Sequence, residues 1–106
     1  MNQINQTRLK ARARVLKGMA HPSRLFILEE LSKGERCVCE LTALIGSDMS
    51  TVSKHLTVMQ NIGLVDSDKR GTQVFYSLRV PCVLKFMHCV ESVLQANAEA
   101  QMACVK

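Results

Sequence analysis

Apolar residues recur at helical spacing over most of the chain, and they alternate with polar residues in only one stretch. The helical stripes predict helices over residues 7–19, from Pro22 to about Gly34, 39–45, 49–61 and 82–101. Between the last two, Leu64-Val65-Asp66 and Thr72 to Leu78 are typical of two strands joined by a polar turn at residues 67–71. The pattern therefore predicts a mostly α-helical fold with a small β-hairpin.

The predicted helix ends carry residues whose conformation or hydrogen bonding suits them. Pro22 is tolerated at a first helical position, and Asp48 is a good N-cap. Gly46 ends the third predicted helix and supplies the tight turn before the fourth. Two helices joined by such a turn, at about residues 38–62, are typical of a helix-turn-helix, and the hairpin at about 64–79 would be its wing.

Length, charge and motif content narrow the class of protein. At 106 residues, with 47% hydrophobic and 22% charged side chains, the chain should form one globular domain, 1–106. A net charge of +5, with Lys and Arg concentrated at residues 8–24 and 69–79, favours nucleic acid as a partner. Paired carboxylates, a phosphate loop and a nucleophile–base motif are all missing, so we do not expect an enzyme.

The sequence also bears on the compartment. The N-terminus lacks the apolar segment of a signal peptide, and no apolar run approaches the ~20 residues that span a bilayer. Five cysteines is an odd number, which does not suit a fully paired disulfide framework. We therefore expect a cytoplasmic protein with reduced thiols and no membrane partner.

The fourth predicted helix has the composition of a DNA-reading helix. Small polar and basic side chains suit the start of such a helix, where it approaches the groove floor, and cations at the hairpin tip suit the DNA backbone. The predicted DNA-binding residues are Ser50, Thr51, Ser53, Lys54, His55, Lys69, Arg70, Thr72 and Gln73. For His55, a structural hydrogen bond within the protein is an equally good alternative.

Two cysteines separated by one residue, Cys37 and Cys39, lie at the start of the predicted helix-turn-helix. On an ideal helix such residues point about 200° apart, but the first residue at a helix start is not yet helical, so the thiols can converge. Arg36 and the helix N-terminus would both favour thiolates, which prefer ions such as As(III), Sb(III), Cd(II) or Pb(II). The alternative is inert packing, because cysteine is often buried.

Several segments, in this order, resemble the ArsR/SmtB family of metal-responsive winged-helix repressors. They are His21-Pro22-x-Arg24 with Ile27-Leu28, Cys37-Val38-Cys39-Glu40-Leu41, Val52-Ser53-Lys54-His55-Leu56, Gly63-Leu64-Val65 and Arg70-Gly71-x-x-Val74-x-Tyr76-x-Leu78. The resemblance covers nearly the full chain and implies a winged helix-turn-helix. It also implies dimerisation helices at about residues 7–19 and 82–101, and hence a homodimer on double-stranded operator DNA.

By the same resemblance, Cys37 and Cys39 occupy the third-helix metal position of the arsenic and cadmium sensors. Residues 1–20 contain no Cys or His, although the cadmium/lead sensors add cysteines there. The last-helix site of the zinc and nickel sensors is absent, since its positions hold Val80, Cys82, Val93 and Ala96. The resemblance therefore favours an arsenic/antimony-sensing repressor, which As(III) or Sb(III) releases from its operator.

The identity of a third thiolate stays open. Some arsenic sensors carry a third cysteine where this chain has Thr42, so Cys82, Cys89 or Cys104 could supply it. Cd(II) or Pb(II) sensing, or a thiol-redox or persulfide switch in the same fold, are alternatives. Two disulfide pairings are disfavoured: Cys37 and Cys39 are too close in sequence for an easy disulfide, and Cys82 and Cys89 would lie about 10 Å apart along one helix.

Overall fold

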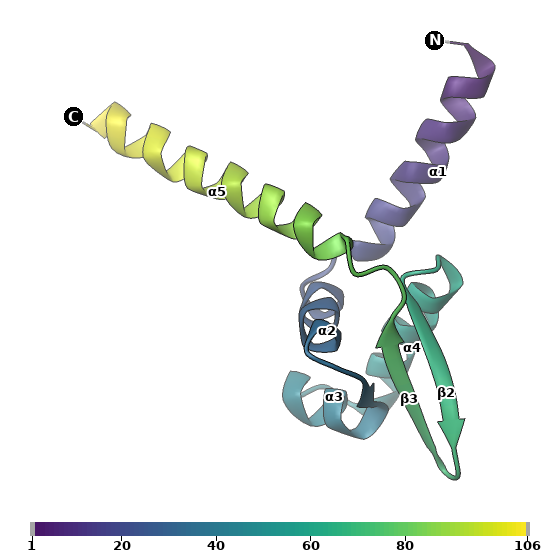
Figure 1. Ribbon diagram of the computed structural model, residues 1–106. Helices are drawn as coiled ribbons and strands as arrows, with labels where there is room; N and C mark the ends of the chain where they lie inside the picture. The colour runs from purple at the N-terminus through teal and green to yellow at the C-terminus, as the bar shows by residue number, and fades with distance from the viewer. Residues whose placement is uncertain (1, 106) are drawn as a thin grey trace.

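Five helices and one three-stranded antiparallel sheet make up the described part of the chain (Figure 1). The computed structural model describes residues 2–105, and the side chains of all of these except residues 4, 104 and 105. The elements are α1 (Gln3–Met19), α2 (Pro22–Ser32), β1 (Arg36–Cys37), α3 (Val38–Ile45), α4 (Met49–Asn61), β2 (Val65–Arg70), β3 (Gln73–Leu78) and α5 (Val83–Val105).

Helices α2, α3 and α4 and the sheet form a central domain, and the β2–β3 hairpin lies along one side of it. Helices α1 and α5 diverge from the top of this domain (Figure 1). The fold is therefore a winged helix-turn-helix, flanked by a helix at each end of the chain as predicted. Within the described residues, no helix combines the length and the apolar character needed to cross a membrane.

The core lies between α2, α4 and the inner face of the sheet. Its fully or almost fully buried side chains include Ile27, Leu28, Leu31, Leu41, Val52, Leu56, Met59, Val65 and Tyr76. Fully burying one aliphatic side chain contributes roughly 1.5–3 kcal/mol, so this cluster fixes the orientation of α4. The predicted inward stripe of α4, Val52, Leu56 and Met59, is confirmed.

The turn between α3 and α4 is fixed at both ends. Gly46 ends α3 with a φ of 79°, in the left-handed region that side chains other than glycine rarely adopt. Asp48 begins α4, since its Oδ1 accepts a hydrogen bond from the Thr51 backbone N at 3.2 Å. Both residues have the roles that the sequence predicted.

The hairpin differs from the prediction. β2 continues to Arg70 and β3 begins at Gln73, so the predicted polar turn at residues 67–71 is wrong. Arg70 pairs with Gln73, which leaves a two-residue loop in which Gly71 adopts a φ of 64°. Such short loops need positive φ, which glycine supplies. Strand pairing, rather than apolar character, keeps the polar residues of β2 extended.

The outer helices are longer than predicted. α1 starts at Gln3 instead of residue 7, because the Asn2 side chain caps it by accepting from the Asn5 backbone N at 2.9 Å. α5 continues to Val105 instead of residue 101. A strand that the sequence did not reveal, β1, pairs Arg36 with Tyr76 and Cys37 with Phe75, and two residues are too few to show alternation.

Candidate nucleic-acid interface and thiol pair

The first turns of α4 present an exposed polar surface. Ser50, Thr51 and Lys54 are exposed and Ser53 is partly buried, while Val52 on the opposite face is fully buried. Hydroxyls and a cation near a helix N-terminus can bond phosphates and base edges. The structure thus brings these four predicted DNA-binding residues together on one face.

Asp48 orients part of this surface, a role that the sequence analysis did not assign to it. Ser50 Oγ donates to Asp48 Oδ2 at 3.1 Å. Hydrogen bonds from the Thr51 side chain, then from Ser50, hold the pKa of the Asp48 carboxyl below its usual range. An ionised N-cap therefore fixes the serine and threonine that would approach DNA.

His55 belongs to a small cluster at the junction of α1, α2 and α4. Its Nδ1 accepts from Arg24 Nε at 3.0 Å, and its ring lies 4.4 Å from the His21 ring. Arg24 Nη1 also donates to the Gly18 carbonyl at 3.4 Å. Burial, and then the charges of His21 and Arg24, lower the pKa of His55. This geometry favours the structural role for His55 over contact with DNA.

The two cations of the wing differ in their surroundings. Arg70 Nη1 and Nη2 donate to the two Glu35 oxygens at 2.6 and 2.9 Å, and Arg70 Nε donates to Asp68 at 2.9 Å. The hydrogen bond from Arg70 lowers the pKa of Glu35. Lys69 is exposed and makes no ion pair within the described residues. Thr72 and Gln73 are exposed beside it at the tip.

Cys37 and Cys39 lie in different environments although one residue separates them. Cys37 is 5% exposed, whereas Cys39 is exposed on the first turn of α3. Cys37 has an extended backbone, with φ −82° and ψ 161°, as the N-cap of that helix. Among the described residues, no group of three Cys, His, Asp or Glu side chains is assembled to hold a metal ion. Because Cys37 is buried, joint ligation by the two cysteines would require Cys37 to become accessible.

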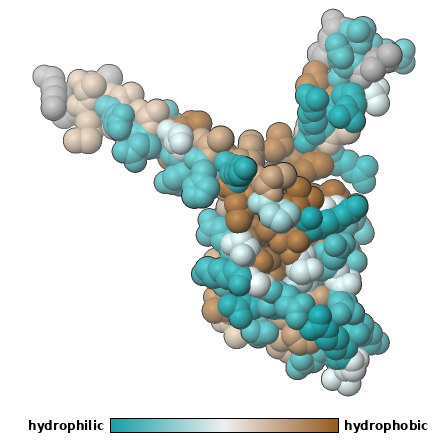
Figure 2. Space-filling view, in the orientation of Figure 1, coloured by the Kyte–Doolittle hydropathy of each residue, from teal (hydrophilic) through white to brown (hydrophobic). Residues whose placement is uncertain are grey.

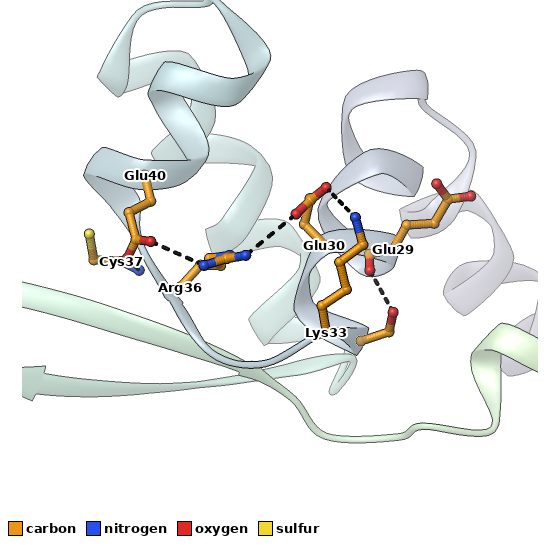
Figure 3. A network of polar contacts seen from close by, with 7 residues as sticks. Glu29, Glu30, Lys33, Arg36, Cys37 and Glu40 are labelled. Atoms are coloured by element: carbon orange, nitrogen blue, oxygen red, sulfur yellow. Dashed lines mark hydrogen bonds and ion pairs between the residues drawn. The ribbon is translucent and has the colours of Figure 1, made fainter.

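Carboxylates lie on both sides of Arg36, and one of them, Glu40, lies beside Cys37 (Figure 3). Glu40 Oε1 accepts from the Cys37 backbone N at 3.2 Å, and this bond is the main reason why the pKa of Glu40 is lowered. Arg36 Nη1 lies 3.3 Å from Glu40 Oε2, and Arg36 Nη2 lies 3.9 Å from Glu30 Oε2. Glu30 also forms an ion pair with Lys33. The charge of Arg36 is therefore shared between two carboxylates.

The remaining cysteines lie near or on α5. Cys82 immediately precedes the helix and Cys89 is on it, and both are exposed. Neither joins Cys37 and Cys39 in a three-donor group within the part of the chain that is described. The side chain of Cys104 lies outside the described residues, so its candidacy as a third ligand is a prediction only.

The outer helices carry an exposed apolar surface. Figure 2 shows hydrophobic residues gathered where α1 and α5 meet the central domain. A groove of about 800 Å³ opens there between α1, α2 and α5. Exposed apolar residues on the two outer helices include Leu9, Leu16, Phe86, Val90, Val93 and Leu94. Met19 and Val83, at the inner ends of the predicted stripes, are buried in the core instead.

Known proteins are similar to this chain in sequence and in fold. Residues 21–67 match the family described as "Bacterial regulatory protein, arsR family". The HTH-type transcriptional regulator YgaV of Escherichia coli is 33% identical over 96 residues, which cover 88% of this chain and 97% of that protein. The chain belongs to the arsR family.

A solved member of this fold extends the match to the outer helices. The homodimeric winged helix-turn-helix DNA-binding domain from Mycobacterium bovis aligns with a TM-score of 0.78 at 29% identity, covering 94% of this chain and 93% of that one. The arsR-family chain thus has the architecture of a domain that is described as both dimeric and DNA-binding.

Two further relatives match over a shorter segment. NmtR of Mycobacterium tuberculosis is 44% identical over 66 residues. The cadmium resistance transcriptional regulatory protein CadC homolog of Staphylococcus aureus is 39% identical over 67 residues. Each match covers 62% of this chain and 55% of the relative, so the matched segment spans about half the length of these two proteins.

Proposed function

We propose that this arsR-family protein is a homodimeric transcriptional repressor, released from its operator when Cys37 and Cys39 bind As(III) or Sb(III). The observation that carries the proposal is the position of the two cysteines. They begin the helix that leads, through the turn at Gly46, directly into the polar face of α4.

Homodimerisation is supported by the apolar surface of α1 and α5. One winged module offers few DNA contacts, and specific sites usually require a larger interface than a single module provides. The exposed apolar residues of the outer helices would be covered by a second copy, as in the homodimeric Mycobacterium bovis domain. Two copies related by a two-fold axis would present two α4 helices to half-sites about one DNA turn apart.

Release is supported by the geometry of the thiol pair. Cys37 is buried and Cys39 is exposed, so Cys37 must move to become accessible before the two sulfurs can share an ion. That movement would disturb the N-terminus of α3 and, through it, the placement of α4. A coupling free energy of about 1–3 kcal/mol would change DNA affinity about 5–150-fold.

Two alternatives have support of their own. Cd(II) is also a thiophilic ion, and the Staphylococcus aureus relative is named for cadmium resistance. A thiol-redox or persulfide switch is favoured by the exposure of Cys39, Cys82 and Cys89, because exposed thiols are open to oxidants.

Titration of the reduced protein separates these candidates. Arsenite, antimonite, Cd(II) and Zn(II) would each be added while thiolate charge-transfer absorbance and binding to a DNA site selected from random sequence are followed. We expect stoichiometric As(III) or Sb(III) uptake with loss of DNA binding. Cys37→Ser and Cys39→Ser should each bind DNA normally but lose this release, and Cys89→Ser tests in parallel whether Cys89 supplies a third thiolate.

Normal release by As(III) in either Cys37→Ser or Cys39→Ser would place the sensing site elsewhere. A response to oxidant or sulfide without As(III) uptake would favour the redox switch instead.

A further inference from the structure

One side chain of the wing spans all three strands of the sheet. Arg70, the last residue of β2, lies over the ring of Phe75 on β3, with its guanidinium carbon 4.7 Å from the ring centroid. It then reaches Glu35, just before β1, and makes two hydrogen bonds to the carboxylate. Asp68 accepts from its Nε. We call these four residues, Glu35, Asp68, Arg70 and Phe75, the wing clasp.

The clasp lies on the same face of the sheet as the first cysteine. Cys37 and Asp68 are both directly opposite Phe75 in the strand register. Directly opposite residues of antiparallel strands share a face, and Tyr76, the next residue of β3, points into the core from the other face. Phe75 is therefore the common neighbour of the thiol strand and of Arg70.

The environment of Arg70 argues against a direct contact with DNA. Two carboxylates balance its charge, so it offers little net attraction to a phosphate. A bidentate pair with an added stacking contact is also the geometry in which an exposed arginine pair is most effective. Lys69 has no such partner within the described residues, which leaves it as the wing cation available to DNA.

We propose that Arg70 is a positioning residue, held by Glu35 across Phe75, which aligns the wing for DNA and transmits the state of the thiol pair to it. Cys37 is at once the last residue of β1 and the N-cap of α3. Movement of Cys37 on binding an ion would therefore disturb the pairing of β1 with β3 as well as the start of α3. The thiol part of this inference rests on the function proposed above.

The direction in which DNA affinity changes when one charge is removed tests the clasp. Glu35→Gln raises the net charge by one, which by electrostatics alone should tighten DNA binding. If Glu35 aligns the wing, the variant binds DNA about two- to fivefold more weakly, as expected for one exposed ion pair. Asp66→Asn is the matched control, because Asp66 is exposed on β2 outside the clasp. It should bind DNA equally well or slightly more tightly.

A second variant separates positioning from phosphate contact. Arg70→Lys keeps the charge but loses the bidentate geometry and the stacking. It should weaken binding as much as Glu35→Gln does, the double variant should be no weaker than either, and the salt dependence should stay unchanged. Lys69→Gln should instead reduce the salt slope by about one phosphate. Tighter binding by Glu35→Gln, or near-normal binding by Arg70→Lys, would overturn the clasp.

The link to the thiols has its own readout. In both clasp variants, the factor by which arsenite weakens DNA binding should be about two- to fivefold smaller than in the wild type. An unchanged factor would overturn the link while leaving the clasp in place. If arsenite does not release the wild type at all, the sensing proposal fails, and the affinities without arsenite still decide whether the clasp positions the wing.

Discussion

The central domain and the two outer helices use similar side chains in opposite ways. Leu41 and Leu56 of the central domain are completely buried, whereas Val93 and Leu94 of α5 are 57% and 56% exposed. The polar face of α4, which we propose contacts DNA, and the pair Cys37 and Cys39 both lie on the central domain. The outer helices present an apolar surface that a single chain leaves uncovered. The side chains that fold the central domain and the side chains that we expect to join two copies are thus in different parts of the molecule.

The boundary between the two regions runs through the outer helices themselves. Val83 and Met19 are buried against the central domain, while Phe86 and Val90, on the same stripe as Val83, are 44% and 46% exposed. The helical spacing of these apolar residues predicts that all of them are buried. It does not separate residues that pack within one chain from residues that would pack against a second copy.

The largest expected effect comes from breaking the outer region alone. Phe86→Glu puts a carboxylate where we expect a second copy to pack, and an unpaired buried charge is strongly unfavourable. The dimer dissociation constant, measured by sedimentation equilibrium, should rise by more than about 100-fold. The central domain should keep its thermal unfolding transition.

Leu44→Glu is the control for this substitution, since Leu44 is 53% exposed on α3, away from the outer helices. It should leave the dimer intact. Equal dissociation in both variants, or none in Phe86→Glu, would contradict the separation of the two regions.

A smaller effect is expected where the regions meet, in the cluster around His55. The pKa of His55 is lowered in the folded protein, so the unfolded chain takes up its proton first as the pH falls. Its contribution to stability is therefore present above the unfolded pKa of about 6.5 and is lost as the pH falls towards the folded pKa. Burial is the largest cause of the lowered pKa of His55, and the charges of His21 and Arg24, which face it, act in the same direction.

Urea unfolding between pH 5 and 8 measures this contribution. The wild type should lose stability below about pH 6.5, and His55→Gln, whose amide oxygen can still accept from Arg24, should show a flatter profile. If His55→Gln lost stability more steeply with falling pH than the wild type, the claim that folding favours the uncharged form of His55 would be contradicted.

Local signals in the sequence predicted most of the fold. Asp48 fixes the start of α4 through its side-chain cap, and Gly46 fixes the end of α3 through its left-handed backbone. The apolar residues spaced along α4 form its buried face. Partners distant in sequence were not predictable in the same way. The pair of Glu35 with Arg70 joins residues 35 positions apart and has no local pattern.

The thiol pair shows the same limit. The spacing of Cys37 and Cys39 and their place before the third helix were visible in the sequence. Their unequal burial was not, because it follows from the pairing of Cys37 with Phe75 in a strand of two residues. Likewise, the carboxylates of Glu30 and Glu40 meet Arg36 only after α2 and α3 are folded.

The central claim is that the state of Cys37 and Cys39 is thermodynamically coupled to DNA binding. Reciprocity requires that DNA weakens inducer binding by the same factor by which the inducer weakens DNA binding. The direct measurement is the affinity of the reduced dimer for As(III), with and without a saturating concentration of its selected DNA site. We predict that the DNA-bound protein binds As(III) about 5–150-fold more weakly. Equal affinities in the two states would contradict the account.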